Sequence, residues 1–309
     1  MKRSKEYILL FAVILGVGLY LALRSSDGVH YELPRLEGVS PQNVDRIAIE
    51  TGNRSLSLRE TNGTWRMTGT GYEAEGDTVQ QMLRQVTTPG LTALVSESGD
   101  YSRYHLDPER RIEVRAGGDG EILRQLSIGK SAGQVGNCYV KLPEDPNVYM
   151  AERDLRGTFD TTAQKLRDKT VFRLDPHKVR SLRLSSRNAS REFRRSAQGN
   201  ATGAWETARG DAVQGEPIED LLRNLESLRC REYKRSLSRN GTRYAIRVDS
   251  SGTHSLSLFA PDKKHPGAYE AQSSQSADPF ELPGYMGKEI SSSVKELLNQ
   301  SSGRSDPPQ

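Results

Sequence analysis

Apolar and polar side chains alternate along several short stretches of this chain, which is the spacing of a strand with one buried face. The first set begins with Ile47 and Ile49 and reaches Trp65 through the dipeptide Asn62-Gly63. Both residues of that dipeptide tolerate positive φ angles, so it favours a tight hairpin. The alternation predicts antiparallel strands over residues 44–50, 54–60 and 64–68.

The spacing changes to that of a helix after Asp77, where apolar residues recur every three or four positions. Leu83 lies in this stripe, which runs to about Thr88, and Pro89-Gly90 ends it. Alternation then returns and predicts further strands near residues 92–97, 110–116, 121–128, 137–142 and 147–151.

The order strand, strand, tryptophan, helix, strands recurs after residue 178 with a period of about 135 residues. The two tryptophans of the chain, Trp65 and Trp205, take equivalent places, and Leu222 corresponds to Leu83 in the helical stripes. One matched strand would carry little weight, but a matched series in the same order indicates an internal duplication. We therefore expect these four side chains at repeat-equivalent core positions.

A run without charge or proline spans Tyr7 to Leu23, behind the basic residues Lys2, Arg3 and Lys5. As a helix rising about 1.5 Å per residue it is roughly 26 Å long, a little short of a bilayer core of about 30 Å. The basic tip predicts that the N-terminus stays in the cytoplasm and that the C-terminal body is periplasmic. The residues expected to meet lipid are Tyr7, Leu10, Phe11, Ile14, Leu19 and Tyr20.

A cleaved signal peptide and a buried soluble helix are the alternatives for this run. It is longer than the usual signal-peptide core of about 7–15 residues, and small residues are missing from the cleavage positions. Its two faces are equally apolar, which is not typical of a helix packed on a soluble core. We expect an uncleaved anchor that crosses the cytoplasmic membrane once.

These patterns predict an α+β fold class: an N-terminal transmembrane helix followed by two tandem, duplicated antiparallel-sheet-plus-helix repeats. In the alignment of the two halves, Ile246 and Val248 correspond to Ile112 and Val114. The predicted parts are a cytoplasmic tip 1–6, a transmembrane helix 7–23, a tether 24–43, a first α+β repeat 44–151, a connecting segment 152–178, a second α+β repeat 179–299 and a disordered tail 300–309.

Composition narrows the class of protein. Charged residues make up 27% of the chain, and the mean hydropathy is −0.68, so the body behind the anchor is expected to be soluble. A formal net charge of +4 over 309 residues is mild and does not indicate a nucleic-acid-binding stripe. Cys138 and Cys230 are compatible with one disulfide or with two buried free thiols, and a metal site would need more ligands at suitable spacing.

The segment 128–133 reads IGKSAG and resembles two catalytic motifs in part. A phosphate-binding loop ending at Ser131 would need a glycine where Arg124 stands, and a helix afterwards. A nucleophile elbow also requires a following helix, whereas the next residues are typical of a loop. A glycine-rich hairpin loop is the favoured interpretation. His105 and Asp107 could form a dyad, or could pack or be solvated at a turn before Pro108.

Basic residues gather in the second half. Their default interpretation is a solvated face, and attraction to anionic lipid headgroups or acidic glycan is the alternative. The clusters contain Arg187, Arg191, Arg194 and Arg195, then Arg229, Arg231, Lys234, Arg235 and Arg239, then Lys263, Lys264 and His265.

Two segments carry a resemblance to a known family: YHLDPERRIEV at 104–114 and KLRDKTVFRLDPHKVRSLRL at 165–184. They resemble a bacterial domain of unknown function, DUF4340, although His105 stands where the family has glycine. The resemblance implies a membrane-anchored protein with a duplicated α+β body, similar to components encoded beside gliding-motility-type ABC transporters. It implies no catalytic residue.

The main functional hypothesis is a non-enzymatic, single-pass accessory or scaffold protein of an ABC-type transporter or envelope complex. Its sheet edges would be surfaces for strand addition. A periplasmic glycan- or lipid-binding module is the second hypothesis, and it requires Trp65, Trp205 or tyrosines in an exposed groove. An envelope hydrolase using Ser131 or His105 is the third. We expect membrane lipid as a partner through the N-terminal helix, and neither cofactor nor nucleic acid.

Overall fold

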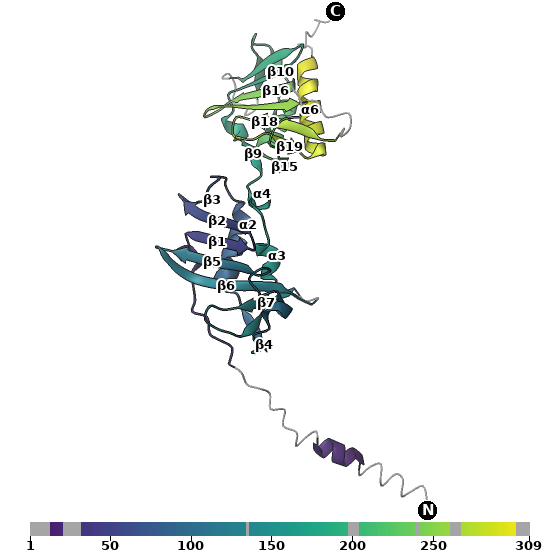
Figure 1. Cartoon of the computed structure of the whole chain (residues 1–309). Coiled ribbons are helices and arrows are strands. Elements are labelled where there is room, and N and C mark those ends of the chain that lie inside the picture. The colour runs from purple at the N-terminus through teal and green to yellow at the C-terminus, as the bar shows by residue number, and fades with distance from the viewer. Residues whose placement is uncertain are drawn as a thin grey trace, which may run out of the picture. The chain divides into compact units, whose positions relative to one another are not determined.

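The computed structural model describes residues 13–20, 32–133, 136–196, 204–238, 241–259 and 267–300. These residues form two compact units (Figure 1). The first unit ends at Thr162 but omits Tyr72–Glu75, and the second unit consists of Tyr72–Glu75 and the chain from Ala163 onward.

The first unit is built on an eight-stranded antiparallel sheet with the order β3-β2-β1-β5-β6-β7-β8-β4. Each strand predicted in the first half overlaps an observed one. The strands are β1 (Arg46–Thr51), β2 (Arg54–Thr61), β3 (Thr64–Met67), β4 (Leu91–Ser96), β5 (Ile112–Gly118), β6 (Glu121–Ala132), β7 (Asn137–Lys141) and β8 (Val148–Ala151). The helices are η1 (Pro41–Asn43), α2 (Gly76–Thr87), η2 (Tyr101–Tyr104) and α3 (Leu155–Phe159).

One face of this sheet is buried because side chains alternate along each strand. Ile47 and Ile49 are buried, while Ala48 between them points to the opposite face. The helix α2 places its apolar stripe, including Val79 and Met82, in the same core and contacts β5 and β6. The predicted periodicity therefore decides which face of the sheet stays open.

The second unit contains a nine-stranded antiparallel sheet with the order β13-β12-β11-β10-β16-β17-β18-β19-β15, and a separate pair, β14-β9. The strands are β9 (Thr170–Arg173), β10 (Ser181–Ser186), β11 (Ser190–Arg195), β12 (Trp205–Thr207), β13 (Ala212–Val213), β14 (Ser227–Arg229), β15 (Glu232–Tyr233), β16 (Thr242–Asp249), β17 (Thr253–Phe259), β18 (Tyr269–Ser273) and β19 (Phe280–Leu282). The helices are α4 (Ala163–Leu166), η3 (Pro176–Lys178), α5 (Glu216–Leu225) and α6 (Gly284–Asn299). Helices α5 and α6 contact each other and bury their apolar stripes in this unit's core.

The two large sheets share one strand order from β3 to β8 and from β12 to β19, with α2 and α5 inserted at the same point of the sequence. Trp65 lies opposite Glu60 on β2, and Trp205 lies opposite Arg195 on β11. In each hairpin the residue opposite the tryptophan lies two positions beyond the residue that pairs with the buried side chain of the central strand. The two tryptophans therefore occupy the same register position. Leu83 and Leu222 also take matching places in the buried stripes of α2 and α5.

Strand pairing corrects one detail of the sequence alignment. Ile246 lies opposite Leu184, just as Val114 lies opposite Ile49. Ile246 therefore corresponds to Val114, and the alignment with Ile112 is wrong by two residues. A shift of two keeps every side chain on its face of the strand, so alternation alone does not detect it.

The N-terminal part requires a correction of the predicted fold class. The structure describes residues 13–20 of the apolar run, and these residues are helical. Among the described residues, no helix is long and apolar enough to cross a membrane. The body is mostly antiparallel sheet, and the predicted transmembrane helix ahead of it is contradicted for the described residues, so the fold class is corrected to two units that are mainly antiparallel sheet.

The residues predicted to meet lipid divide into two groups. Ile14, Leu19 and Tyr20 lie on the short helix and are 60%, 57% and 62% exposed. Tyr7, Leu10, Phe11, the tip 1–6 and tail residues 301–309 lie outside the described residues.

A buried arginine organises one corner of the second unit, to which Tyr72–Glu75 belong. Arg167 is 7% exposed and lies between the rings of Tyr72 and Tyr233, 3.7 and 3.3 Å from their centroids. It donates to Asp278 at 2.7 Å, and this hydrogen bond lowers the pKa of that carboxyl. The charge is tolerated inside the unit because it is both paired and stacked.

Candidate functional site

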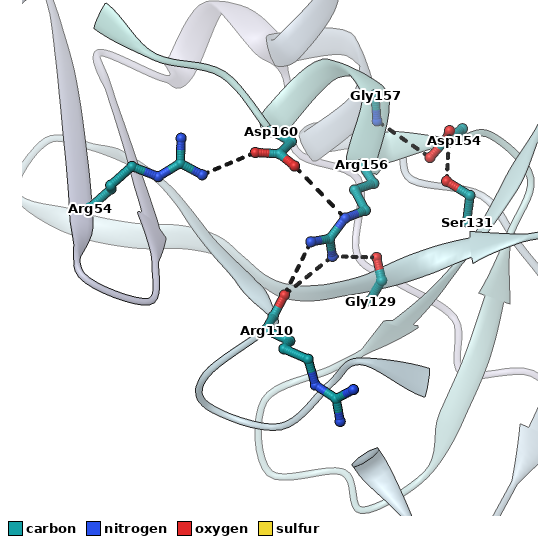
Figure 2. A network of polar contacts seen from close by, with 8 residues as sticks. All are labelled: Arg54, Arg110, Gly129, Ser131, Asp154, Arg156, Gly157 and Asp160. Atoms are coloured by element: carbon teal, nitrogen blue, oxygen red, sulfur yellow. Dashed lines mark hydrogen bonds and ion pairs between the residues drawn. The ribbon is translucent and has the colours of Figure 1, made fainter. Parts of the chain in front are cut away.

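The IGKSAG segment lies on a strand. Ser131 is inside β6, which pairs with β7 in a hairpin, so the predicted hairpin is confirmed while the motif itself is strand rather than loop. Ser131 Oγ donates to Asp154 Oδ2 at 3.0 Å, and Asp154 caps α3 by accepting from Gly157 N at 3.3 Å (Figure 2). The serine thus supports a helix cap and does not occupy a nucleophile elbow.

Around this cap, Arg156 ties α3 to the sheet. Its guanidinium donates to the backbone oxygens of Gly129 and Arg110 at 3.0 and 3.2 Å, and Asp160 lies 4.0 Å away (Figure 2). A Cβ at Gly129 would lie 2.3 Å from Tyr104 O, so close packing requires glycine there. Each of these residues therefore has a structural role, either in capping α3 or in holding it against the sheet.

His105 ends η2 in the left-handed region, with φ at 56°. Glycine is favoured in that conformation. The pKa of His105 is lowered, first by desolvation and then by the charge of Arg110. Asp107 pairs with Arg110 at 2.8 Å, and the hydrogen bond from Arg110 lowers the pKa of this carboxyl. Arginine charge dominates the turn, so it does not form an acid–base dyad.

Both cysteines are free and buried, which agrees with the interpretation of two buried thiols. Burial raises the pKa of Cys138 and of Cys230 to about 11 in each case. Thiols with such pKa values stay protonated near neutral pH and are poor nucleophiles.

The open face of the first sheet carries a hollow of about 400 Å³. Ala48 lines it and lies opposite Ser57 on β2 and Arg115 on β5, which also line it. Arg46 lies opposite Arg59 two pairs further along the same strands, on the same face of the sheet. We call Arg46, Arg59 and Arg115, together with the hollow they line, the arginine face.

The charges of the arginine face are only partly compensated. Arg115 pairs with Glu50 at 2.8 Å, but this pair is partly exposed and therefore weak. Arg46 donates to the backbone oxygen of Glu121 at 3.1 Å, which carries no net charge. Among the described residues Arg59 has no ion-pair partner, and like charges directly opposite each other are unfavourable.

Two further residues shape this site. A Cβ at Gly117 would lie 2.5 Å from Arg46 Nε and 2.6 Å from Glu121 O, so glycine lets the Arg46 side chain lie across β5. Ile122 lines the hollow and is 59% exposed. Guanidinium groups bind carboxylates in a planar, bidentate geometry, and small central residues leave room for one. The arrangement therefore suits an acidic group beside an apolar one.

Sequence reasoning missed the arginine face because it looked for basic clusters in the linear sequence. Its arginines are 13 and 56 positions apart along the chain. A signal was nevertheless present, since each occupies the strand face opposite to predicted core residues such as Ile47 and Val114.

The predicted core residues are not available to a ligand. Trp65 is 6% exposed and Trp205 2% exposed, and Leu83 and Leu222 are also buried. Neither indole can therefore serve as a stacking platform for a sugar ring.

Comparison with known proteins gives one match. A family model described as a domain of unknown function (DUF4340) matches residues 65–244, from β3 of the first unit into β16 of the second. No curated protein and no solved structure matches the chain.

Proposed function

This chain belongs to the DUF4340 family, and from that premise we propose that it is a non-enzymatic accessory protein that binds a protein partner on its arginine face. The partner segment is acidic and carries an apolar side chain. A subunit of an ABC-type transporter or envelope complex is the first partner to test, as the resemblance in the sequence implies.

The observation that carries this proposal is the combination of charge and space on one sheet face. Arg46, Arg59 and Arg115 surround a hollow of about 400 Å³, and Ile122 is exposed beside them. Keeping cations close together is unfavourable for folding alone. It is favourable when a carboxylate arrives, because charge-assisted hydrogen bonds are about twice as strong as neutral ones.

The lengths of the edge strands favour binding at the arginine face over strand addition at a sheet edge. Three of the four edge strands of the two large sheets are short: β13 and β15 have two residues each and β3 has four, whereas β4 has six. Short edge strands offer few unpaired backbone groups to an incoming strand.

Co-purification of the full chain from mild detergent tests the proposal. A transporter or envelope subunit should be recovered with the wild type and should be lost with the double variant Arg59→Ala/Arg115→Ala. The matched control is Arg194→Ala/Arg247→Ala, which changes the register-equivalent residues of the second sheet.

Recovery of the chain alone, with no such subunit, would refute the accessory role. Equal recovery with both double variants would refute the arginine face as the binding site. The expected location at the cytoplasmic membrane, with the body outside the cytoplasm, stays a prediction that a reporter fused to the C-terminus can check.

A further inference from the structure

A second hollow lies in the second unit, beside the last turn of α6. Its volume is about 450 Å³. The hairpin between β10 and β11, the first residues of β16 and the end of α6 contribute its lining: Ser186, Arg187, Asn188, Ala189, Gly241, Arg243, Tyr244, Lys295, Leu298 and Asn299. We call it the α6 pocket.

The α6 pocket brings three cations together. Arg187 comes from the hairpin, Arg243 from β16 and Lys295 from α6. None of the described residues that line it is acidic, and among the described residues none of these three cations has an ion-pair partner. The pocket therefore concentrates positive charge that the unit itself does not neutralise.

The floor of the pocket is apolar. Tyr244 and Leu298 line it and are 8% and 9% exposed, so they belong to the unit's core. Arg191 donates to the backbone oxygen of Leu297 at 3.4 Å and so satisfies one carbonyl in the last turn of α6. A ligand in this pocket meets cations at the rim and a hydrocarbon surface beneath.

The equivalent corner of the first unit is neutralised. By strand register Arg243 corresponds to Arg111, which pairs with Glu113 at 3.1 Å. The position of Glu113 is taken by Ala245 in the second unit. The hairpin between β1 and β2 in the first unit corresponds to the β10–β11 hairpin that carries Arg187. Its arginine, Arg54, pairs with Asp160 at 3.2 Å.

We infer that the α6 pocket binds an anion carried on an apolar stem, a phosphate or carboxylate joined to a hydrocarbon or aromatic group. The oxyanion accepts hydrogen bonds from the two guanidinium groups and the ammonium, and the stem packs on the floor. Such a ligand is either a soluble amphiphile or the headgroup region of an anionic lipid. The pocket is separate from the arginine face, so the two sites can fail or succeed independently.

Calorimetric titration of the full chain with octyl phosphate tests this inference, with inorganic phosphate and octanol as partial ligands. Octyl phosphate should bind at least about tenfold more tightly than either, because it alone uses both the rim and the floor. The variant Arg187→Ala/Arg243→Ala should weaken octyl phosphate binding about tenfold or more, since hydrogen bonds to charged groups are the strong ones. The control Arg54→Ala should leave it unchanged.

Absence of octyl phosphate binding, or equal binding by the double variant, would overturn the inference. Circular dichroism checks that the exposed substitutions leave the fold intact. Vesicles of phosphatidylglycerol and of phosphatidylcholine distinguish the two sources. Loss of phosphatidylglycerol binding in the double variant identifies a lipid headgroup, and octyl phosphate binding without a vesicle difference identifies a soluble ligand.

Discussion

The open faces of the two large sheets differ at their centres although their strands follow the same order. In the first unit Ala48 lies opposite Ser57, and both side chains are small. In the second unit the same register position holds Arg183 opposite Glu192, and the guanidinium of Arg183 donates to the carboxylate of Glu192. Arg194 also pairs with Glu192, at 2.8 Å.

This difference teaches where binding is to be sought. The second sheet pairs Arg183 and Arg194 with its own carboxylate, Glu192, and the hollow of about 350 Å³ on its open face is lined by two acidic residues, Glu192 and Asp249. The hollow of the first sheet is lined by Arg46, Arg59 and Arg115 and by no acidic residue, so positive charge remains for a partner. Both faces rest on equally buried cores, with Ile47 and Leu182 at matching positions. The contrast is therefore a property of the open faces and not of the fold.

The largest effect is expected in the cores, where the two tryptophans are compared. Trp205→Ala and Trp65→Ala should each cost about 3–5 kcal/mol of their unit's unfolding free energy. Phenylalanine separates them, because Trp205 Nε1 donates to Glu219 at 2.8 Å and Arg195 lies 4.8 Å from the Trp205 ring. Trp205→Phe should cost about 1.5–3 kcal/mol more than Trp65→Phe.

Urea unfolding followed by circular dichroism measures these losses, with each unit's transition fitted separately. Equal losses for the two phenylalanine variants would mean that the Trp205–Glu219 hydrogen bond adds nothing to the second core.

A smaller effect is expected where β5 and β16 cross the open faces. Gly117→Ala should destabilise the first unit by about 1–3 kcal/mol, because the new Cβ meets Arg46 and the backbone oxygen of Glu121. The equivalent change Asp249→Ala should stay within about 0.5 kcal/mol. Urea unfolding checks both, and an unaffected Gly117→Ala would show that Arg46 can move away at no cost.

The sequence predicts much of the fold because alternation and helical spacing are local. Strands on either side of Asn62-Gly63 and the helix ending before Pro89-Gly90 are found where expected. Alternation does not fix register, so the sequence alignment of the two halves matches Ile246 with Ile112 instead of Val114. The arginine face depends on that register, since Arg46 meets Arg59 only when β1 and β2 are paired as observed.

The N-terminal run has a different lesson. Hydropathy measures the length of an apolar segment, whereas a span also requires a helix of that length. Within the part of the chain that the structure describes, no helix is long and apolar enough to cross a membrane. The α6 pocket could not be predicted from the sequence for another reason. The end of α6 and a hairpin about a hundred residues earlier line it together, and no local sequence pattern indicates that contact.

Transplanting the centre of one sheet into the other tests the comparison directly. The variant Ala48→Arg/Ser57→Glu gives the first sheet the ion pair of the second. Partner recovery should fall about tenfold or more, equivalent to about 1.4 kcal/mol, because the new carboxylate competes with the partner for the arginines and the longer side chains take up part of the hollow. Unfolding free energy should change by less than about 1 kcal/mol, since an exposed pair contributes little.

Quantitative co-purification and urea unfolding measure the two quantities. The reverse change, Arg183→Ala/Glu192→Ser, should fold normally and serves as the matched control. Undiminished recovery with the filled first sheet would contradict binding in the hollow.

The smallest effect concerns Glu192 and depends on pH. Hydrogen bonds from Arg183, and then from Arg194, lower the pKa of this carboxyl in the folded state. Its contribution to stability is therefore fully present above the unfolded pKa of about 4.3 and is lost as the pH falls through the folded value. At pH 7 the wild type should exceed Glu192→Gln by about 0.2–1 kcal/mol, because the arginines are largely exposed. Unfolding of both proteins at several pH values should show this gap closing below about pH 4.3. A gap that stays constant in acid would mean that the neutral amide is accommodated differently, and that charge pairing does not distinguish the second sheet from the first.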